Sequence, residues 1–365
     1  MPEAGFLGYA LWLVMTALAL GTIYAAIAYR LHPGFLIPLA AGMILVNLPA
    51  AGLQARIAPF VSAVQYLWDR GVYPPLILFC LGAGLDLSYL IAHPRQIWVG
   101  LLSPFAFLAL MFLGWQLGLT PPEAGITPLA VGGDGGVSAI FLCGWFARDL
   151  VGPVGLTAAL LTGLLPWVLP PLAQIFTSRQ ERMIRMPGTR KVAKRENIIF
   201  AAAGLVLTSL LVPGAMMLTG MFFLGNLLKE SGVVERLART LANRLGDILV
   251  ALLGLAVGTR CQAANILSLT FLKVILVSLV ALLLVSLVGI MAIKLANLFT
   301  RNKVNPLVGA ALLGLPPHAA QVAQVMGRRE DPHNNLFPHA LAASQAGLLA
   351  ATLTAGLLWG ILGVG

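Results

Sequence analysis

Long stretches of this sequence carry no charged residue, and they constrain the fold more than any other feature. Among them are residues 96–122, 150–178 and 274–293. A helix needs about 20 apolar residues to cross the hydrocarbon core of a bilayer. Only 10% of all residues are charged, whereas a soluble domain has about 25%. We therefore predict an all-α, multi-pass membrane protein, with room for about ten spans.

The basic residues indicate membrane topology. The net charge is +10, and residues 179–196 hold seven Lys or Arg against two Glu. Such an excess of positive charge favours the cytoplasmic side. Topology and attraction to anionic lipid headgroups explain this basic loop more simply than a docking site for a soluble protein does. The membrane is thus an expected partner, nucleic acid is not, and the predicted location is the inner (plasma) membrane.

This basic loop, residues 178–196, divides the chain into two hydrophobic halves, 1–177 and 197–365. Transporters are often built from two inverted repeats whose broken helices meet near the midplane of the bilayer. Residues 129–141 (LAVGGDGGVSAIF) can be aligned with residues 255–267 (LAVGTRCQAANIL), which begin with the same four residues. We therefore expect one broken helix in each half, at these two segments.

In this alignment Asp134 lies opposite Arg260, and each is the only charge in its segment. Irregular backbone inside a membrane is tolerated only where it is buried in protein or lines a watery cavity, and an acid at such a depth usually has a functional partner. We expect Asp134 to form an ion site, with Arg260 beside it as an internal cation and with Gln262 and Asn265 in the same cavity. The alternative is a glycine-rich surface loop in which Asp134 is hydrated.

Other polar residues carry weaker signals. Asp86 lies among small residues and either lines an ion pathway or marks the end of a helix. His318 and His339 make a weak metal signal, because the only carboxylates between them lie in a polar turn. No Ser-His-Asp order, GxSxG motif or phosphate-binding loop occurs, so no catalytic residue of the kind found in soluble enzymes is predicted.

Several blocks of the sequence, taken in order, are similar to one known family. They are GGDGGVSAIF (132–141), PPLAQIFTSRQERMIRM (170–186), GNLLKESGVVERL (225–237), NPLVGAA (305–311) and DPHNNLFPHALAASQAG (331–347). Over nearly its whole length the chain resembles the beta subunit of the sodium-ion-translocating decarboxylases of oxaloacetate, methylmalonyl-CoA, glutaconyl-CoA and malonate.

The resemblance implies a function and a set of partners. In that family a soluble alpha subunit transfers a carboxyl group from the substrate to biotin. Decarboxylation of the carboxybiotin at the beta subunit consumes a proton and drives sodium ions outward, and a small gamma membrane subunit helps assembly. The expected ion is therefore sodium, and no other metal is expected. Biotin is expected on the alpha subunit, and the chain is expected to act as an ion-translocating subunit within a homo-oligomer.

The family's site motifs match this sequence unevenly. The first motif reads roughly GGADGPTAIF, and alignment through residues 139–141 places Gly135 at the position of its ion-binding acid. Asp134 therefore stands one residue too early. The second motif, roughly GATASAET, corresponds to GTRCQAAN (258–265), in which Arg260 replaces a threonine. Because a guanidinium is always charged, we expect Arg260 to weaken sodium coupling.

Two further positions differ from the family. The family has a pair of tyrosines at the positions that Ala159 and Leu161 occupy in this sequence. In the last span the family motif HAMGPNVAG has an asparagine where this sequence has Ser344. Two functions therefore stay open: the pump subunit of a biotin-dependent decarboxylase, or a sodium-independent carrier or non-transporting assembly paralogue. The predicted ion-binding residues are Asp134, Gly133, Gly135, Ser138, Asn305 and Ser344.

Overall fold

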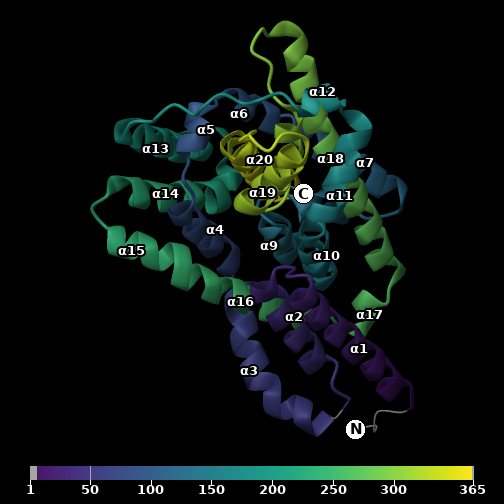
Figure 1. The fold of residues 1–365 in the computed structure, drawn as a ribbon. Coiled ribbons are helices and arrows are strands. Elements are labelled where there is room, and N and C mark those ends of the chain that lie inside the picture. The colour runs from purple at the N-terminus through teal and green to yellow at the C-terminus, as the bar shows by residue number, and fades with distance from the viewer. Residues whose placement is uncertain (1–5, 50, 364–365) are drawn as a thin grey trace.

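The computed structural model describes residues 6–49 and 51–363, and these residues form helices without any β-strand (Figure 1). The predicted all-α class is confirmed. Five helices are long and apolar enough to cross a membrane, or six if a pair bent by 61° counts as one span. The five are Gly8–Ala28, Arg95–Gln116, Glu235–Gly258, Leu269–Phe299 and Phe337–Gly363, and the bent pair is Arg148–Gly163 with Leu165–Phe176.

The first half of the chain consists mostly of short apolar helices. Several of them, α2, α4, α7, α8 and α11, have proline in the first turn, where its missing N–H leaves no helical hydrogen bond unmade. The elements are α1 (Phe6–Ala28), α2 (Pro33–Val46), α3 (Ala51–Asp69), α4 (Tyr73–Gly84), α5 (Ser88–Ala92), α6 (Arg95–Gly100), α7 (Ser103–Gln116), α8 (Pro121–Ile126), the 3-10 helix η1 (Thr127–Val131), α9 (Val137–Phe146), η2 (Arg148–Leu150), α10 (Val151–Gly163), α11 (Leu165–Phe176) and α12 (Arg179–Arg182).

The second half contains the longest helices. Here α15, η5 and α16 follow one another without a gap and form a single candidate span. The elements are α13 (Lys194–Leu211), η3 (Pro213–Ala215), the π-helix η4 (Met216–Gly220), α14 (Met221–Ser231), α15 (Glu235–Arg239), the π-helix η5 (Thr240–Leu245), α16 (Gly246–Gly258), α17 (Ala263–Ile266), α18 (Leu269–Phe299), the 3-10 helix η6 (Pro306–Leu312), α19 (Pro316–Glu330) and α20 (Phe337–Gly363).

Glycines let the helices pack with their backbones in close contact. α2 packs along α16, and α4 packs along α14. A Cβ at Gly258 would lie 2.0 Å from the carbonyl oxygen of Leu39, and a Cβ at Gly225 would lie 2.0 Å from that of Phe79. Small residues at helix crossings are typical of membrane proteins, in which van der Waals packing rather than the hydrophobic effect holds helices together.

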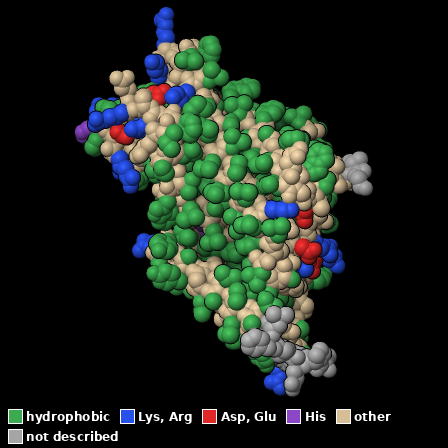
Figure 2. Space-filling view, turned by 90° about the vertical axis from the view of Figure 1, so that its right-hand side faces the viewer, with side chains coloured by type: hydrophobic (Ala, Val, Ile, Leu, Met, Phe, Trp, Pro, Cys, Tyr) green, Lys and Arg blue, Asp and Glu red, His purple; other side chains and the backbone are tan. Residues whose placement is uncertain are grey.

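α20 occupies the centre of the molecule, where it contacts α19, η6 and α6 (Figure 1). Its buried residues extend from His339 to Leu358. The side of the molecule that carries α18 and α7 is covered with hydrophobic side chains, and Lys and Arg gather toward its upper end (Figure 2). A large apolar face of this kind is what a lipid-facing surface requires.

A candidate ion site between two interrupted helices

The first interruption lies at residues 132–136, between η1 and α9. Gly135 and Gly136 have φ of 72° and 84°, a left-handed conformation that glycine adopts without strain. Asp134 is fully buried at this point. Its carboxylate accepts the N–H of Gly136 at 3.2 Å and that of Ser138 at 2.6 Å. Asp134 thus caps the first turn of α9, where the helix dipole favours a negative charge.

A second interruption, at residues 313–315 between η6 and α19, lies against the first. The N–H of Gly314 donates to the carbonyl oxygen of Gly132 at 3.3 Å. α20 packs against the same place, because a Cβ at Gly133 would lie only 2.3 Å from the backbone nitrogen of Leu348. Two interrupted helices and the central helix therefore enclose the buried acid.

A cavity of about 290 Å³ opens beside Asp134. Most of its wall is apolar and comes from α2, α4, α9, α10, η5 and α16. The polar side chains in the wall, besides Asp134, include His32, Thr162 and Asp247. The cavity gives water or a small ion room beside the acid.

Two histidines that are far apart in the sequence meet in this region. The rings of His32 and His318 lie 5.8 Å apart, edge to face at 70°. His32 has φ of 37°, and its Nε2 lies 3.4 Å from Oγ1 of Thr162. Nε2 of His318 is buried and has no hydrogen-bond partner among the described residues. Sequence reasoning missed His32 because no motif marks it, and only the fold brings it to His318.

The structure separates the two histidines that formed the weak metal signal. His318 lies beside His32, whereas the ring centroid of His339 lies 3.9 Å from that of His93, with the rings tilted by 34°. Across residues 6–49 and 51–363, no group of three or more His, Cys, Asp or Glu is arranged to hold a metal ion.

The surroundings of Asp134 supply oxygen atoms rather than a counter-ion. Oγ of Ser138 is buried and lacks a hydrogen-bond partner within the described part of the chain. Asp134 takes part in none of the ion pairs found there. A carboxylate and a hydroxyl are hard oxygen donors, which suit a small hard cation.

The structure brings four of the predicted ion ligands together, because Gly133, Asp134, Gly135 and Ser138 all lie at the first interruption. Ser344 lies at the second one. Its Oγ donates to the carbonyl oxygen of Pro316 at 3.0 Å, at the start of α19. Whether these residues bind an ion stays a prediction.

Asn305 makes contacts that sequence reasoning did not foresee. It is fully buried, and its Nδ2 donates to the carbonyl oxygens of Arg182 and Ile184 at 2.7 and 3.0 Å. Its Oδ1 accepts the N–H of Leu307 at 3.0 Å, and Asn334 also donates to Ile184, at 2.8 Å. Asn305 therefore caps η6, which begins at Pro306, and its hydrogen bonds attach the basic loop to this helix. An ion-ligating role for Asn305 stays a prediction that requires these bonds to open.

The prediction that Arg260 lies beside Asp134 is wrong. Nη2 of Arg260 donates instead to Oδ1 of Asp69, at the end of α3, at 2.8 Å. Gln262 and Asn265 follow in the same turn after α16 and are not among the residues that line the Asp134 cavity. Leu, Ala, Val and Gly recur throughout this sequence, so four shared residues did not identify the right partner segment. The segment that meets residues 132–136 is 313–315.

Asp86 lies at a helix end, which is one of the two possibilities that the sequence left open. It is exposed between α4 and α5, and its carboxylate accepts the N–H of Ser88 at 3.0 Å. Asn226 donates to the carbonyl oxygens of Gly82 and Leu85, at the end of α4. These contacts complete the helix ends, and a role for Asp86 in an ion pathway stays a prediction.

These features define a class of protein: a multi-pass membrane protein in which two interrupted helices and a central helix bury one acid among oxygen donors. Discontinuous helices of this kind form ion and substrate sites in secondary transporters. The chain belongs to the family described as Na+-transporting oxaloacetate decarboxylase beta subunit, whose sequence model matches residues 12–362. It is accordingly a multi-pass protein of the inner membrane.

Individual relatives are similar over almost the whole chain. The methylmalonyl-CoA decarboxylase subunit beta of Propionigenium modestum is 34% identical, with 96% of this chain and 95% of the relative covered. The oxaloacetate decarboxylase beta chain 2 of Salmonella typhi is 32% identical, with 94% of each covered. The glutaconyl-CoA decarboxylase subunit beta of Acidaminococcus fermentans is 31% identical, with 100% and 96% covered.

Proposed function

We propose that this chain is the membrane subunit of a biotin-dependent decarboxylase complex and couples the decarboxylation of carboxybiotin to sodium export. Membership of the family supports the proposal. The observation that carries it is Asp134, which is fully buried between two helix interruptions. An acid at such a depth costs about 2.5 to 3.5 kcal/mol on insertion scales, and a bound cation offsets that cost.

In this proposal Asp134 binds the sodium ion, although it stands one residue before the family's acid. On a regular helix a shift of one residue turns a side chain by about 100°. Here the backbone is not helical, since Gly135 and Gly136 have positive φ, and Asp134 still points into the protein. Oγ of Ser138 and the backbone carbonyl oxygen of Gly133 are the further ligands that we propose.

We also propose that the two halves are inverted repeats whose equivalent segments are residues 127–146 and 305–330. Each begins with a polar residue followed by Pro-Leu and forms a 3-10 helix, an interruption with glycine and an α-helix. Each also follows a long apolar helix, α6–α7 or α18, and precedes a further long segment, α10–α11 or α20. The shorter apolar helices then provide the rest of about ten spans.

The proposed partners follow from this function. Biotin would arrive on an alpha subunit, where it supplies a labile carboxyl group, and a gamma membrane subunit and further copies of this chain would complete the complex. The basic loop, residues 178–196, marks the cytoplasmic side on which the alpha subunit would dock. The alpha subunit would determine which carboxylic acid is consumed.

One observation favours a second function, a sodium-independent carrier or non-transporting assembly paralogue. Ala159 lines the Asp134 cavity at a position where the resemblance places a tyrosine, so the cavity lacks that hydroxyl. His32 and Thr162 lie in the same wall.

Reconstitution separates the two functions. The chain is purified with its biotin-carrying and gamma partners, incorporated into proteoliposomes and supplied with the carboxylic acid substrate, and uptake of radioactive sodium is followed. Sodium uptake that stops with Asp134→Asn supports the pump. A chain that purifies without a biotinylated partner, or a complex that decarboxylates at the same rate with and without sodium, supports the second function.

A further inference from the structure

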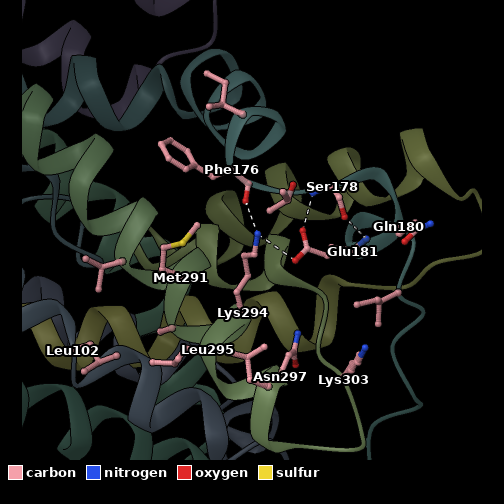
Figure 3. Close-up of a pocket in the computed structure, with 16 residues that line it drawn as sticks. Leu102, Phe176, Ser178, Gln180, Glu181, Met291, Lys294, Leu295, Asn297 and Lys303 are labelled. Carbon is pink, nitrogen blue, oxygen red and sulfur yellow. Dashed lines mark hydrogen bonds and ion pairs between the residues drawn. The ribbon is translucent and has the colours of Figure 1, made fainter.

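A hollow of about 1160 Å³ opens on the surface where α11 ends and the last turns of α18 pass it (Figure 3). Part of its wall is apolar and exposed: Ile175 is 75% exposed and Leu295 is 59% exposed. Polar groups from the end of α11 through α12, from the last turns of α18 and from the loop after α18 form its rim. They are Thr177, Ser178, Gln180, Glu181, Lys294, Asn297 and Lys303.

The length of α18 places this hollow at the boundary between hydrocarbon and headgroups. Lys273 and Lys294 enclose 20 uncharged residues, 274–293. A helix of that length rises about 30 Å, which is the thickness of the hydrocarbon core. Lys294 therefore lies at the level of the headgroups. The basic loop, residues 178–196, supplies Ser178, Gln180 and Glu181 to the same rim, so the hollow belongs to the cytoplasmic leaflet.

The rim carries a positive charge that the protein does not compensate. Nζ of Lys294 lies 3.2 Å from Oε1 of Glu181 and donates to the carbonyl oxygen of Phe176 at 3.0 Å (Figure 3). Lys303 is exposed and lines the hollow, and it takes part in none of the ion pairs found among the described residues. A free cation above an exposed apolar wall complements a molecule with an anionic head and an apolar tail.

We propose that this hollow binds an anionic phospholipid of the cytoplasmic leaflet. The phosphate lies at Lys303, with Gln180 as a hydrogen-bond donor, and an acyl chain follows the apolar wall along α11 and α18. Basic pockets between membrane helices on the cytoplasmic side bind such headgroups. Since α11 belongs to the first half of the chain and α18 to the second, the lipid joins the two halves.

The test is native mass spectrometry of the full-length protein in detergent, titrated with phosphatidylglycerol. Loss of one lysine near a membrane surface weakens binding of an anionic lipid about fivefold, and we expect that change in Kd for Lys303→Gln. The matched control is Lys191→Gln, which removes an exposed charge from the basic loop outside the hollow and should leave Kd unchanged. Ile175→Ser should also weaken binding, because it removes apolar contact without changing charge.

Several outcomes would overturn the proposal. Equal effects of Lys303→Gln and Lys191→Gln would show that charge acts without a specific site. Equal binding of phosphatidylcholine with the same acyl chains would remove the role of the anionic head. Competition by glycerol phosphate alone would indicate a site for soluble anions. If a photo-crosslinker placed at position 295 captured a polypeptide instead of lipid, the hollow would be the site of a protein partner. Circular dichroism confirms that each variant remains folded.

Discussion

The N–H of Gly314 donates to the carbonyl oxygen of Gly132 at 3.3 Å, and this contact joins two helix interruptions from opposite halves of the chain. Asp134 is buried beside it. Gly314 has φ of 74°, a conformation that glycine adopts without strain. The acid therefore lies where the two halves meet, and a change in the packing of either helix reaches it directly.

Asp134→Asn tests the ion site. The substitution keeps the size of the side chain and removes its charge. A charge at 4 Å and an effective dielectric of 20 contributes about 4 kcal/mol, so the apparent affinity for sodium should fall about 1000-fold. Sodium-dependent decarboxylation by the reconstituted complex measures it. An unchanged sodium dependence would mean that another group binds the ion.

Arg260→Thr tests whether the guanidinium of Arg260 weakens sodium binding. Because Arg260 pairs with Asp69, and both side chains are partly exposed, its removal should cost no more than about 1 kcal/mol of stability and should not change sodium affinity. Thermal unfolding and sodium titration provide the two measurements. An Arg260→Thr variant that bound sodium much more tightly would show that the guanidinium does act on Asp134.

Gly133→Ala tests the close packing of the first interruption on α20. The new Cβ would lie 2.3 Å from the backbone nitrogen of Leu348, and overpacking of this kind costs about 1 to 3 kcal/mol or more. We expect a lower melting temperature in detergent. Gly21→Ala is the control, since no atom lies within 4 Å of a Cβ there. Equal melting temperatures for the two variants would contradict the packing.

Asn305→Ala tests the attachment of the basic loop. The change leaves the carbonyl oxygens of Arg182 and Ile184 without a donor from η6, and an unmade buried hydrogen bond costs about 1 to 3 kcal/mol. Trypsin should therefore cut the loop after Arg185 and Arg190 several-fold faster. The exposed Asn302 provides the control variant Asn302→Ala. No difference in cleavage between the two would show that Asn305 does not hold the loop.

The His93–His339 pair predicts a dependence of stability on pH. Burial, together with the neighbouring His339 and Arg190, lowers the pKa of His93 to about 4, from 6.5. The folded state therefore resists protonation, so this contribution to stability is complete above pH 6.5 and is lost as the pH falls toward about 4. His93→Gln should flatten the decline in melting temperature over that range, whereas His333→Gln should not. An equal slope for wild type and His93→Gln would refute this account.

Sequence patterns identified the parts of the site that are local in the chain. Asp134, Gly133, Gly135 and Ser138 come from one short segment, so their proximity needed only the recognition that glycines interrupt a helix. Sequence patterns did not identify the segment that contacts it, residues 313–315. Residues 255–267 begin with the same four residues as the first segment. Residues 305–315 share with it mainly a Pro-Leu dipeptide and a 3-10 helix. A 3-10 helix cannot be recognised in a sequence so rich in Leu, Ala, Val and Gly.

The sequence by itself determined that this chain is a helical membrane protein with an acid in an interrupted helix. Uncharged stretches of about 20 or more apolar residues have the length of helical spans, and a helix satisfies all its backbone hydrogen bonds within itself in lipid. Only the tertiary structure decided which groups meet. It paired Arg260 with Asp69, His32 with His318 and Gly132 with Gly314. Such contacts depend on how glycine-rich helices pack across the two halves, and no periodicity along the chain encodes that packing.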